Sequence, residues 1–302
     1  TFLILVFDGY FQFFSGQNIF GFQSERPDRI GGLFFDELKL GSFIVKLFPL
    51  LCVAFFYLKQ KKIKNLFLMF LILSYFMVLL SGERAAFILI NFFVVLSCFG
   101  LMKLKRFIIY SLTFILLMTL LIWNTDSLKN RHYDQFLLHL VNKTPNGETV
   151  FFPEYAMLFK ISQNMFLDNV LFGQGPKTYR ALCFKKKYRK NLDKVAFRKG
   201  KDVFLEKHKY TACTTHTHNY YLQIFSETGL VGAFFVLYFY INVLRKYFFS
   251  IRNRHRINVL ISSGLIVNLW PLTTTGSFFN NWISMTLYIL IAFYLYFFKY
   301  EN

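Results

Sequence analysis

Residues 66–102 read LFLMFLILSYFMVLLSGERAAFILINFFVVLSCFGLM, which is two long apolar runs separated by one short polar turn. The runs, about Leu66–Leu80 and Ala85–Met102, approach the roughly 20 residues that a helix needs to cross a bilayer. A segment in lipid must satisfy its own backbone hydrogen bonds, so both runs are predicted to be helices. The stretch therefore predicts a helical hairpin in a membrane, with Ser81–Arg84 at one surface.

Similar apolar runs recur along the 302-residue chain, which is 55% hydrophobic and contains 42 Phe. Soluble domains of this length rarely carry so much Phe and Leu in long uninterrupted runs. The further runs lie at about Gly41–Leu58, Phe107–Trp123, Leu230–Leu244, Val259–Leu272 and Ile283–Phe298. The sequence therefore predicts an all-α fold, a polytopic membrane helix bundle with about seven full spans plus a partial first one.

The partial span is the apolar run Thr1–Val6, and the sequence begins inside it without a Met. A cleaved signal peptide would leave an unusually short apolar stub at the mature N-terminus. We therefore expect the chain to be a fragment that lacks its N-terminal part.

The charges of the short loops predict how the helices are oriented. Every second connection is basic, at Lys59–Lys64, Lys103–Arg106 and Arg245–Arg256, and Lys299 follows the last span. The positive-inside rule makes these connections cytoplasmic and places the turns between them outside. The three Trp residues fall at predicted outer ends, as in an interfacial aromatic belt.

This orientation divides the chain into three parts. N-terminal membrane helices occupy 1–123, a large periplasmic loop 124–217 and C-terminal membrane helices 218–302. The loop has 17 Lys and Arg against eight Asp and Glu. It is either a solvated loop without a special role or a basic surface that gathers an anionic substrate such as a lipid phosphate. Nucleic acid is not expected as a partner, because no nucleic-acid motif accompanies these charges.

Two stretches of the loop, Asn130–Lys143 and Pro153–Asp168, are predicted to be amphipathic surface helices. Gly173-Gln174-Gly175-Pro176 is predicted to be a turn, since a dinucleotide-binding loop would need a third glycine and a flanking strand. The polar stretch Lys185–Lys209 is expected to be irregular.

The four cysteines are of two kinds. Cys52 and Cys98 lie in predicted spans and are expected to be small apolar core residues. Cys183 and Cys213 lie in the outer loop, in a compartment where disulfides persist. We predict that these two pair, which would contribute on the order of 3 kcal/mol by constraining the unfolded chain. Two unpaired thiols are the alternative.

Three arginines collect at the predicted outer face. Arg26 and Arg29 precede the first full span, and Arg84 lies in the turn quoted above. The planar fork of arginine matches phosphate oxygens, which suits a pyrophosphate leaving group. A charged residue at membrane depth is a functional candidate. The alternative for Arg84 is a side chain that snorkels to the surface and pairs with Glu83.

Two imidazoles follow the outer loop, in His216-Thr217-His218-Asn219-Tyr220-Tyr221-Leu222-Gln223. A neutral His218 beside Glu227 could act as a general base, since the ordinary pKa of histidine lies near neutral pH. The alternative for His218 is a polar residue that opens an interfacial helix. A metal site formed with His208 or Glu206 fits no standard zinc spacing, so no metal is predicted.

The glycines of Glu227-Thr228-Gly229-Leu230-Val231-Gly232 should let the surface helix bend into the next span and pack closely. A Ser–His–Asp hydrolase is disfavoured, because the sequence has no nucleophile elbow.

Three stretches together resemble the O-antigen ligase and O-antigen polymerase superfamily of bacterial envelope glycosyltransferases. They are Arg29-Ile30-Gly31-Gly32-Leu33-Phe34 with Glu37 and Gly41, then Ser81-Gly82-Glu83-Arg84, then the histidine stretch running to Gly232. The large outer loop with a Gly-x-Gly near its middle is similar too, so the resemblance covers nearly the whole chain. Thr217 is a departure, because many members carry proline between the two histidines, and it could loosen the backbone there.

The resemblance implies a metal-independent, inverting transfer of a glycan from an undecaprenyl-pyrophosphate carrier, without a cofactor. Arg29 and Arg84 would hold the pyrophosphate, and His218 would activate the acceptor hydroxyl. Glu227 would orient His218 or only cap the bend. Further candidates for substrate binding are Arg26, His216 and Asn219.

A ligase would pass the glycan to lipid A-core, and a polymerase would pass it to another lipid-linked repeat; the sequence does not separate the two. Either would be a multi-pass protein of the bacterial inner membrane, in contact with membrane lipid and with its active face in the periplasm. The rival is a non-catalytic transporter or flippase of envelope polysaccharide, which should carry charges inside its spans. The spans carry few charges, mainly Lys46, which favours an enzyme. In a third possibility, a membrane scaffold or sensor, both histidines and Arg84 would be dispensable.

Overall fold

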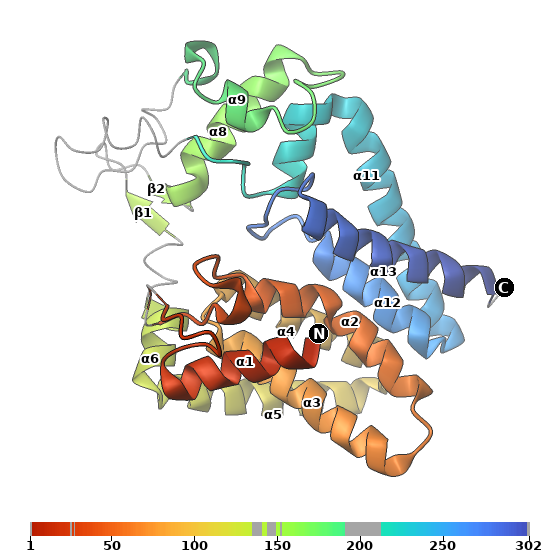
Figure 1. Cartoon of the computed structure of the whole chain (residues 1–302). Helices are drawn as coiled ribbons and strands as arrows, with labels where there is room; N and C mark the ends of the chain where they lie inside the picture. The colour runs from red at the N-terminus through yellow and green to blue at the C-terminus, as the bar shows by residue number, and fades with distance from the viewer. Residues whose placement is uncertain are drawn as a thin grey trace. The chain divides into compact units, whose positions relative to one another are not determined.

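The computed structural model of the protein describes residues 2–24, 26, 28–134, 141–143, 149–151, 153–190 and 213–300. Within these ranges it is almost wholly helical (Figure 1), and six helices are long and apolar enough to cross a membrane. They are α2 (Leu40–Tyr57), α3 (Lys61–Leu80), α4 (Arg84–Leu101), α5 (Leu104–Trp123), α11 (Tyr220–Asn253) and α13 (Asn281–Tyr300). The predicted all-α membrane bundle is thus confirmed.

Two shorter apolar helices accompany these six, α1 (Phe2–Ser15) and α12 (Arg256–Asn268). Helix α12 is shorter than the predicted span at 259–272, and every residue from Asn258 to Asn268 is buried. A helix that is buried on all sides packs against protein. Helix α12 packs against α2 and α4, and a Cβ atom at Gly264 would lie only 2.6 Å from the ring of Pro49. This apolar run therefore belongs to the core of the bundle.

The chain divides into two compact units. Unit 1 comprises Thr1–Asp134, Val243–Asn268 and Thr286–Asn302, and unit 2 comprises Gln135–Asn242 and Leu269–Met285.

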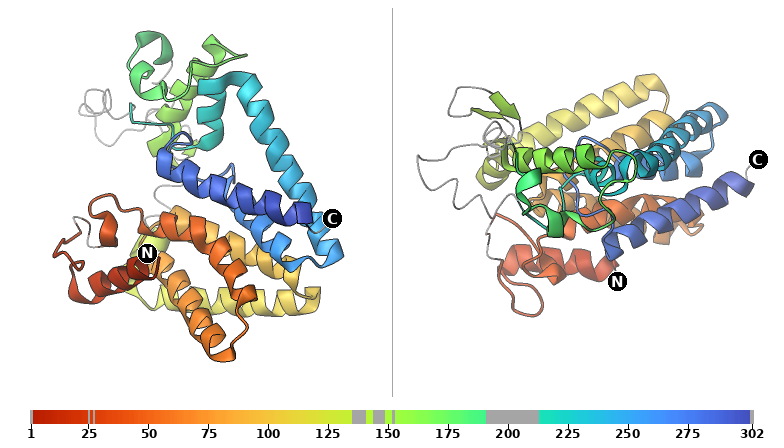
Figure 2. Two further views of the ribbon diagram at one scale, coloured as in Figure 1. Left: turned by 45° about the vertical axis from the view of Figure 1, so that its right-hand side comes forward. Right: turned by 90° about the horizontal axis from the view of Figure 1, so that it is seen from above.

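In unit 1, helices α2, α3, α4 and α5 follow one another up and down, joined by short turns (Figures 1 and 2). Helix α5 buries only Met118 and leaves most of its apolar side chains exposed. An exposed apolar surface of this size is expected where a helix faces lipid. After α5 the chain forms the short helix α6 (Asp126–Lys129) and the π-helical turn η2 (Asn130–Asp134).

The predicted helix over 130–143 is therefore wrong at its end. Residues 135–140 lie outside the described ranges, and β1 (Val141–Lys143) pairs antiparallel with β2 (Thr149–Phe151). The β-branched residues Val141, Thr149 and Val150 favour this extended pairing over a helix.

Unit 2 is built around α8 (Pro153–Asp168), which has the predicted bounds. Its buried face forms a core with residues from the short helix α9 (Tyr179–Leu182) and the 3₁₀ turn η3 (Lys186–Tyr188). The members of this core are Met157, Leu158, Ile161, Met165, Tyr179, Cys183 and Tyr188. Cys183 and Cys213 are joined by a disulfide, with their Cα atoms 5.4 Å apart, and thereby fix the start of the histidine stretch to this core.

Candidate functional site

The turn between α3 and α4 lies against the loop that precedes α2, both within unit 1. The backbone N–H of Ile30 donates to the carbonyl of Ser81 at 3.3 Å. Gly82 has a φ of +67°, and a Cβ atom there would lie 2.5 Å from the carbonyl oxygen of Asp28. Only glycine fits this conformation and this close approach. The two loops that carry Arg29 and Arg84 are thus in backbone contact.

Glu83 is buried and bonds to the N-terminus of α2. Its carboxylate accepts the N–H of Gly41 at 2.7 Å and the hydroxyl of Ser42. A carboxylate at a helix N-terminus satisfies otherwise unpaired N–H groups and is stabilised by the helix dipole. Burial raises the pKa of Glu83, and the hydrogen bonds from Ser42 and the charge of Arg29 oppose that rise. Glu83 was the partner considered for a snorkelling Arg84. Its carboxylate is hydrogen-bonded to the start of α2.

Arg131 connects the two loops, and its role was not predicted from the sequence. It lies in the π-helical turn η2, a geometry that is frequent at functional sites. Its Nε donates to the carbonyl of Gly82 at 2.9 Å, and its Nη1 forms an ion pair with Asp28 Oδ2 at 3.1 Å. The one signal in the sequence is a basic residue within two turns of the end of an apolar run.

Four arginines, Arg26, Arg29, Arg84 and Arg131, lie close enough to influence one another. The pKa of Arg29 is lowered by burial and also by the charges of Arg26 and Arg84, whereas Glu83 and Asp28 raise it. The pKa of Arg131 is lowered by burial and by the other three arginines. A bound anion would relieve their mutual repulsion, and phosphate is one of the anions whose geometry matches the guanidinium fork.

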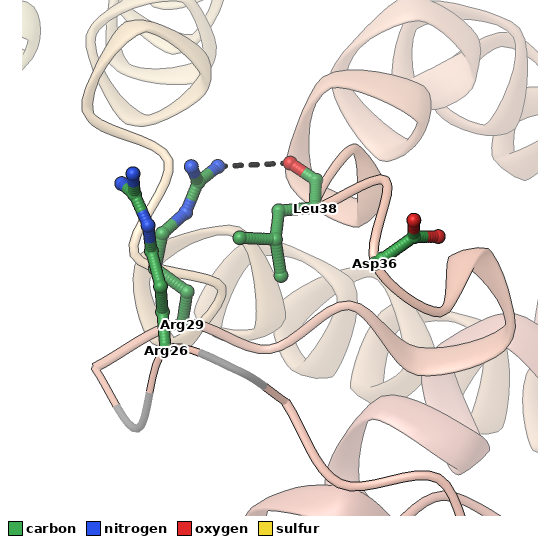
Figure 3. Close-up of a pocket in the computed structure, with 4 residues that line it drawn as sticks. All are labelled: Arg26, Arg29, Asp36 and Leu38. Carbon is green, nitrogen blue, oxygen red and sulfur yellow. Dashed lines mark hydrogen bonds between the residues drawn. The ribbon is translucent and has the colours of Figure 1, made fainter.

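Arg26, Arg29, Asp36 and Leu38 line a pocket of about 310 Å³ (Figure 3). The Arg26 and Arg29 side chains extend in the same direction, and Arg29 Nη2 donates to the carbonyl of Leu38 at 2.8 Å. Arg29 Nε is buried and has no hydrogen-bond partner among the described residues. A buried donor without a partner costs about 1–3 kcal/mol, which a bound anion could recover.

The two histidines lie side by side in unit 2, with ring centroids 4.2 Å apart. Tyr155 of α8 packs 5.4 Å from the His218 ring, and Thr215 Oγ1 lies 2.9 Å from His216 Nδ1. His218 has a φ of +56°, and its carbonyl accepts the N–H of Thr275 at 2.8 Å. A positive φ is uncommon in a residue with a Cβ atom, and such strain clusters at functional sites.

The imidazole of His218 has the properties of a proton acceptor. Burial lowers its pKa below the ordinary value of 6.5, so the ring is neutral at pH 7. Within the part of the chain that the structure describes, no hydrogen bond to protein engages its ring nitrogens. A neutral imidazole with an available nitrogen can accept a proton from a substrate hydroxyl.

Asn219 caps α11. Its Oδ1 accepts the N–H groups of Tyr221 at 3.0 Å and Leu222 at 3.1 Å, and its Nδ2 donates to the carbonyl of Pro271 at 2.8 Å. The Asn219 side chain, which was expected to bind substrate, thus makes hydrogen bonds to the protein backbone. Thr217 is buried and donates to the carbonyl of Asn219 at 2.9 Å, so this threonine constrains the backbone between the two histidines rather than loosening it.

Glu227 is fully buried, and its carboxylate accepts three hydrogen bonds from protein donors. It accepts the N–H groups of Lys177 at 2.8 Å and Tyr179 at 3.0 Å, and Gln223 Nε2 donates to it at 3.1 Å. Among the described residues no hydrogen bond joins Glu227 to His218. The carboxylate therefore anchors the turn before α9 to the first part of α11.

Two glycines allow the turn after α8 to touch the bend of α11 backbone to backbone (Figure 1). Gly229 breaks the helix with φ +64° and ψ −162°, and a Cβ atom there would lie 2.3 Å from the carbonyl oxygen of Leu171. A Cβ atom at Gly173 would lie 2.5 Å from the carbonyl carbon of Glu227. The predicted bend at Gly229 and its close packing are confirmed. The backbone that packs against the bend includes Gly173, the first residue of the predicted Gly173–Pro176 turn.

The structure thus brings Arg26, Arg29 and Arg84 together within unit 1, and His216 and His218 within unit 2. In the described ranges, no group of three or more His, Cys, Asp or Glu could hold a metal ion. His208 and Glu206, the further ligands considered for a metal site, lie outside those ranges.

A family model described as O-antigen ligase matches residues 67–237, which is more than half of the chain. The matched region contains the turn with Arg84, the large loop 124–217 with His216, and then His218 and the bend of α11. A search of curated proteins found no match.

Proposed function

This chain belongs to the O-antigen ligase family, and from that premise we propose that it transfers a glycan from undecaprenyl pyrophosphate to an acceptor hydroxyl. The family indicates ligase- or polymerase-type action on lipid-linked glycans by a multi-pass membrane protein. The acceptor in our proposal is lipid A-core or another lipid-linked repeat. We propose the bacterial inner membrane as its location, with the active face in the periplasm, because alternate loops are basic.

The observation that carries this proposal is the arginine cluster of unit 1. We propose that Arg26, Arg29 and Arg84 bind the pyrophosphate of the donor, with Arg29 Nε as one of the donors to its oxygens. Guanidinium groups bind phosphate oxygens bidentately, and charge-assisted bonds are about twice as strong as neutral ones. The contact of Gly82 with Asp28 supports this assignment, because it keeps the two arginine-bearing loops together.

The proposed reaction is a single displacement. His218 takes the proton of the acceptor hydroxyl as the oxygen attacks the anomeric carbon of the glycan. The bond from that carbon to the pyrophosphate oxygen breaks, and undecaprenyl pyrophosphate leaves with the electron pair. Attack from the opposite side inverts the anomeric centre. The arginines stabilise the negative charge that develops on the leaving group, so the proposed reaction uses no metal and no cofactor.

The other candidate residues have supporting roles in this proposal. His216 contacts the acceptor beside His218, with which its ring is in contact. Glu227 and Asn219 act as positioning residues, because Glu227 accepts backbone N–H groups from the turn before α9 and Asn219 caps the start of α11.

The decisive experiment supplies the purified protein, reconstituted in liposomes, with lipid-linked repeat units in the presence and absence of lipid A-core. Glycan on the core would identify a ligase, and longer lipid-linked chains would identify a polymerase. His218→Ala should abolish either product while the protein remains in the membrane. Movement of lipid-linked glycan across the bilayer without any new glycosidic bond would contradict the transferase proposal and support the non-catalytic transporter.

A further inference from the structure

The end of α8 and the turn that follows it, together Leu167–Phe172, expose four large apolar side chains in unit 2. Leu167 is 61% exposed, Leu171 58% and Phe172 68%, and Val170 is exposed as well. Exposing apolar surface to water is unfavourable. A contiguous exposed patch of this kind marks an interaction site.

The backbone fixes this turn beside the start of a lipid-facing helix. The N–H of Leu230 donates to the carbonyl of Val170 at 2.8 Å, and the N–H of Val231 to that of Leu171 at 3.2 Å. Beyond the bend at Gly229, α11 is a candidate membrane span. Its first residues there also expose apolar side chains: Leu230, Val231, Phe234 and Phe235. The exposed apolar turn therefore continues the exposed apolar surface of the span.

The edge of the patch is basic. Lys187 forms an ion pair at 2.7 Å with Asp168, the one carboxylate within Leu167–Phe172, and thereby balances its charge. Lys185 and Lys186 beside it are exposed, as is the neighbouring Phe184. Lysines near a membrane surface are attracted to anionic head groups. An apolar centre with a cationic edge is the composition of a surface that lies at a bilayer interface.

We propose that the turn Leu167–Phe172 inserts into the lipid bilayer at the level where α11 enters it, and anchors unit 2 to the membrane surface. The partner is the lipid itself, with the acyl chains on Leu171 and Phe172 and anionic head groups on the neighbouring lysines. Because the same turn is bonded to the bend of α11, the anchor fixes the depth at which that helix enters the membrane. This proposal does not depend on the proposed transferase activity.

Spin labels at the turn test the proposal in the reconstituted full chain. Cys52 and Cys98, the free cysteines of the described chain, are replaced by alanine, and the disulfide is left intact. A nitroxide is attached to Leu171→Cys in one variant and to Phe172→Cys in a second. Arg180→Cys, an exposed position of α9 in the same unit, is the matched control. Power saturation then compares collisions with oxygen, which concentrates in lipid, and with a water-soluble nickel chelate.

Labels at both turn positions should collide with oxygen more often, and with the nickel chelate several-fold less often, than the label at position 180. Nickel accessibility equal to that of the control would place the turn in water and overturn the proposal. Low accessibility to both reagents would also overturn it, since it would indicate that protein, such as a second copy of the chain, covers the turn. Two label positions guard against the failure of one variant to fold.

Discussion

Arg131 forms an ion pair with Asp28, with 3.1 Å between Nη1 and Oδ2, and donates from Nε to the carbonyl of Gly82. One side chain thereby holds the loop with Arg26 and Arg29 against the turn with Arg84. The distance between the proposed phosphate-binding arginines thus depends on a residue that follows α5, in a part of the chain remote from both loops.

Arg131→Ala should therefore weaken binding of the lipid-linked donor. We expect KM for the donor to rise about tenfold, equivalent to about 1.4 kcal/mol, with a smaller change in kcat. Asp28→Asn should act in the same direction, and the double variant should be little worse than Arg131→Ala, because the two residues act as a pair. Arg180→Ala is the control and should leave KM unchanged. Additive losses from Arg131 and Asp28 would contradict a shared positioning role.

Arg29→Lys and Arg84→Lys test whether the arginines bind phosphate through their planar fork. Lysine keeps the positive charge but cannot form two parallel hydrogen bonds. Each substitution should lower kcat/KM by about tenfold or more, corresponding to at least 1.4 kcal/mol of lost transition-state stabilisation. Full activity of Arg84→Lys, measured by glycan transfer from the lipid-linked donor, would return Arg84 to the role of a snorkelling side chain.

The lowered pKa of His218 predicts the pH dependence of transfer. A general base acts in its neutral form, so activity is present above the pKa of the folded protein and is lost as pH falls through it. Because burial lowers that pKa below 6.5, the loss should occur on the acid side of pH 6.5. The profile of kcat/KM against pH measures this directly. A midpoint above 6.5 would be inconsistent with the proposed base.

Glu227→Gln distinguishes an anchoring carboxylate from a catalytic one. Glutamine offers one acceptor oxygen to the two backbone N–H groups of Lys177 and Tyr179 and sets an N–H₂ group against one of them. We expect a loss of stability of about 1–3 kcal/mol in thermal unfolding. The pH profile of the remaining activity should be unchanged. An altered profile with unchanged stability would instead indicate that Glu227 acts on the reacting groups.

Gly229→Ala should be more damaging than another glycine replacement at positive φ. The backbone at Gly229 lies in a region that only glycine occupies readily, and the new Cβ atom would meet the carbonyl oxygen of Leu171 at 2.3 Å. Gly16→Ala is the control, because Gly16 has a φ of +81° but no atom within 4 Å of the added Cβ position. The control should cost only the conformational penalty of about 1–2 kcal/mol. Equal unfolding temperatures for the two variants would show that the backbone contact at the bend is dispensable.

Much of the helical architecture could be predicted from the sequence, because an apolar run in lipid satisfies its backbone locally and is helical whatever its neighbours. The run at 259–272 shows the limit of that argument. Apolar side chains suit lipid and protein equally well, so only packing against α2 and α4 revealed α12 as a short buried helix.

The candidate site also has features that could be predicted from the sequence and features that only the structure revealed. Arginine, histidine and carboxylate side chains could be selected from the sequence because their chemistry resides in the residue type. Their partners could not: Glu83 binds Gly41, and Glu227 binds Lys177, across 42 and 50 residues of chain. A membrane helix bundle with cationic and imidazole groups at its polar turns therefore follows from the residue types and their order. That Arg131 joins the arginine loops and that Glu227 is an anchor is visible only in the folded chain, because long-range hydrogen bonds depend on how the chain folds back on itself.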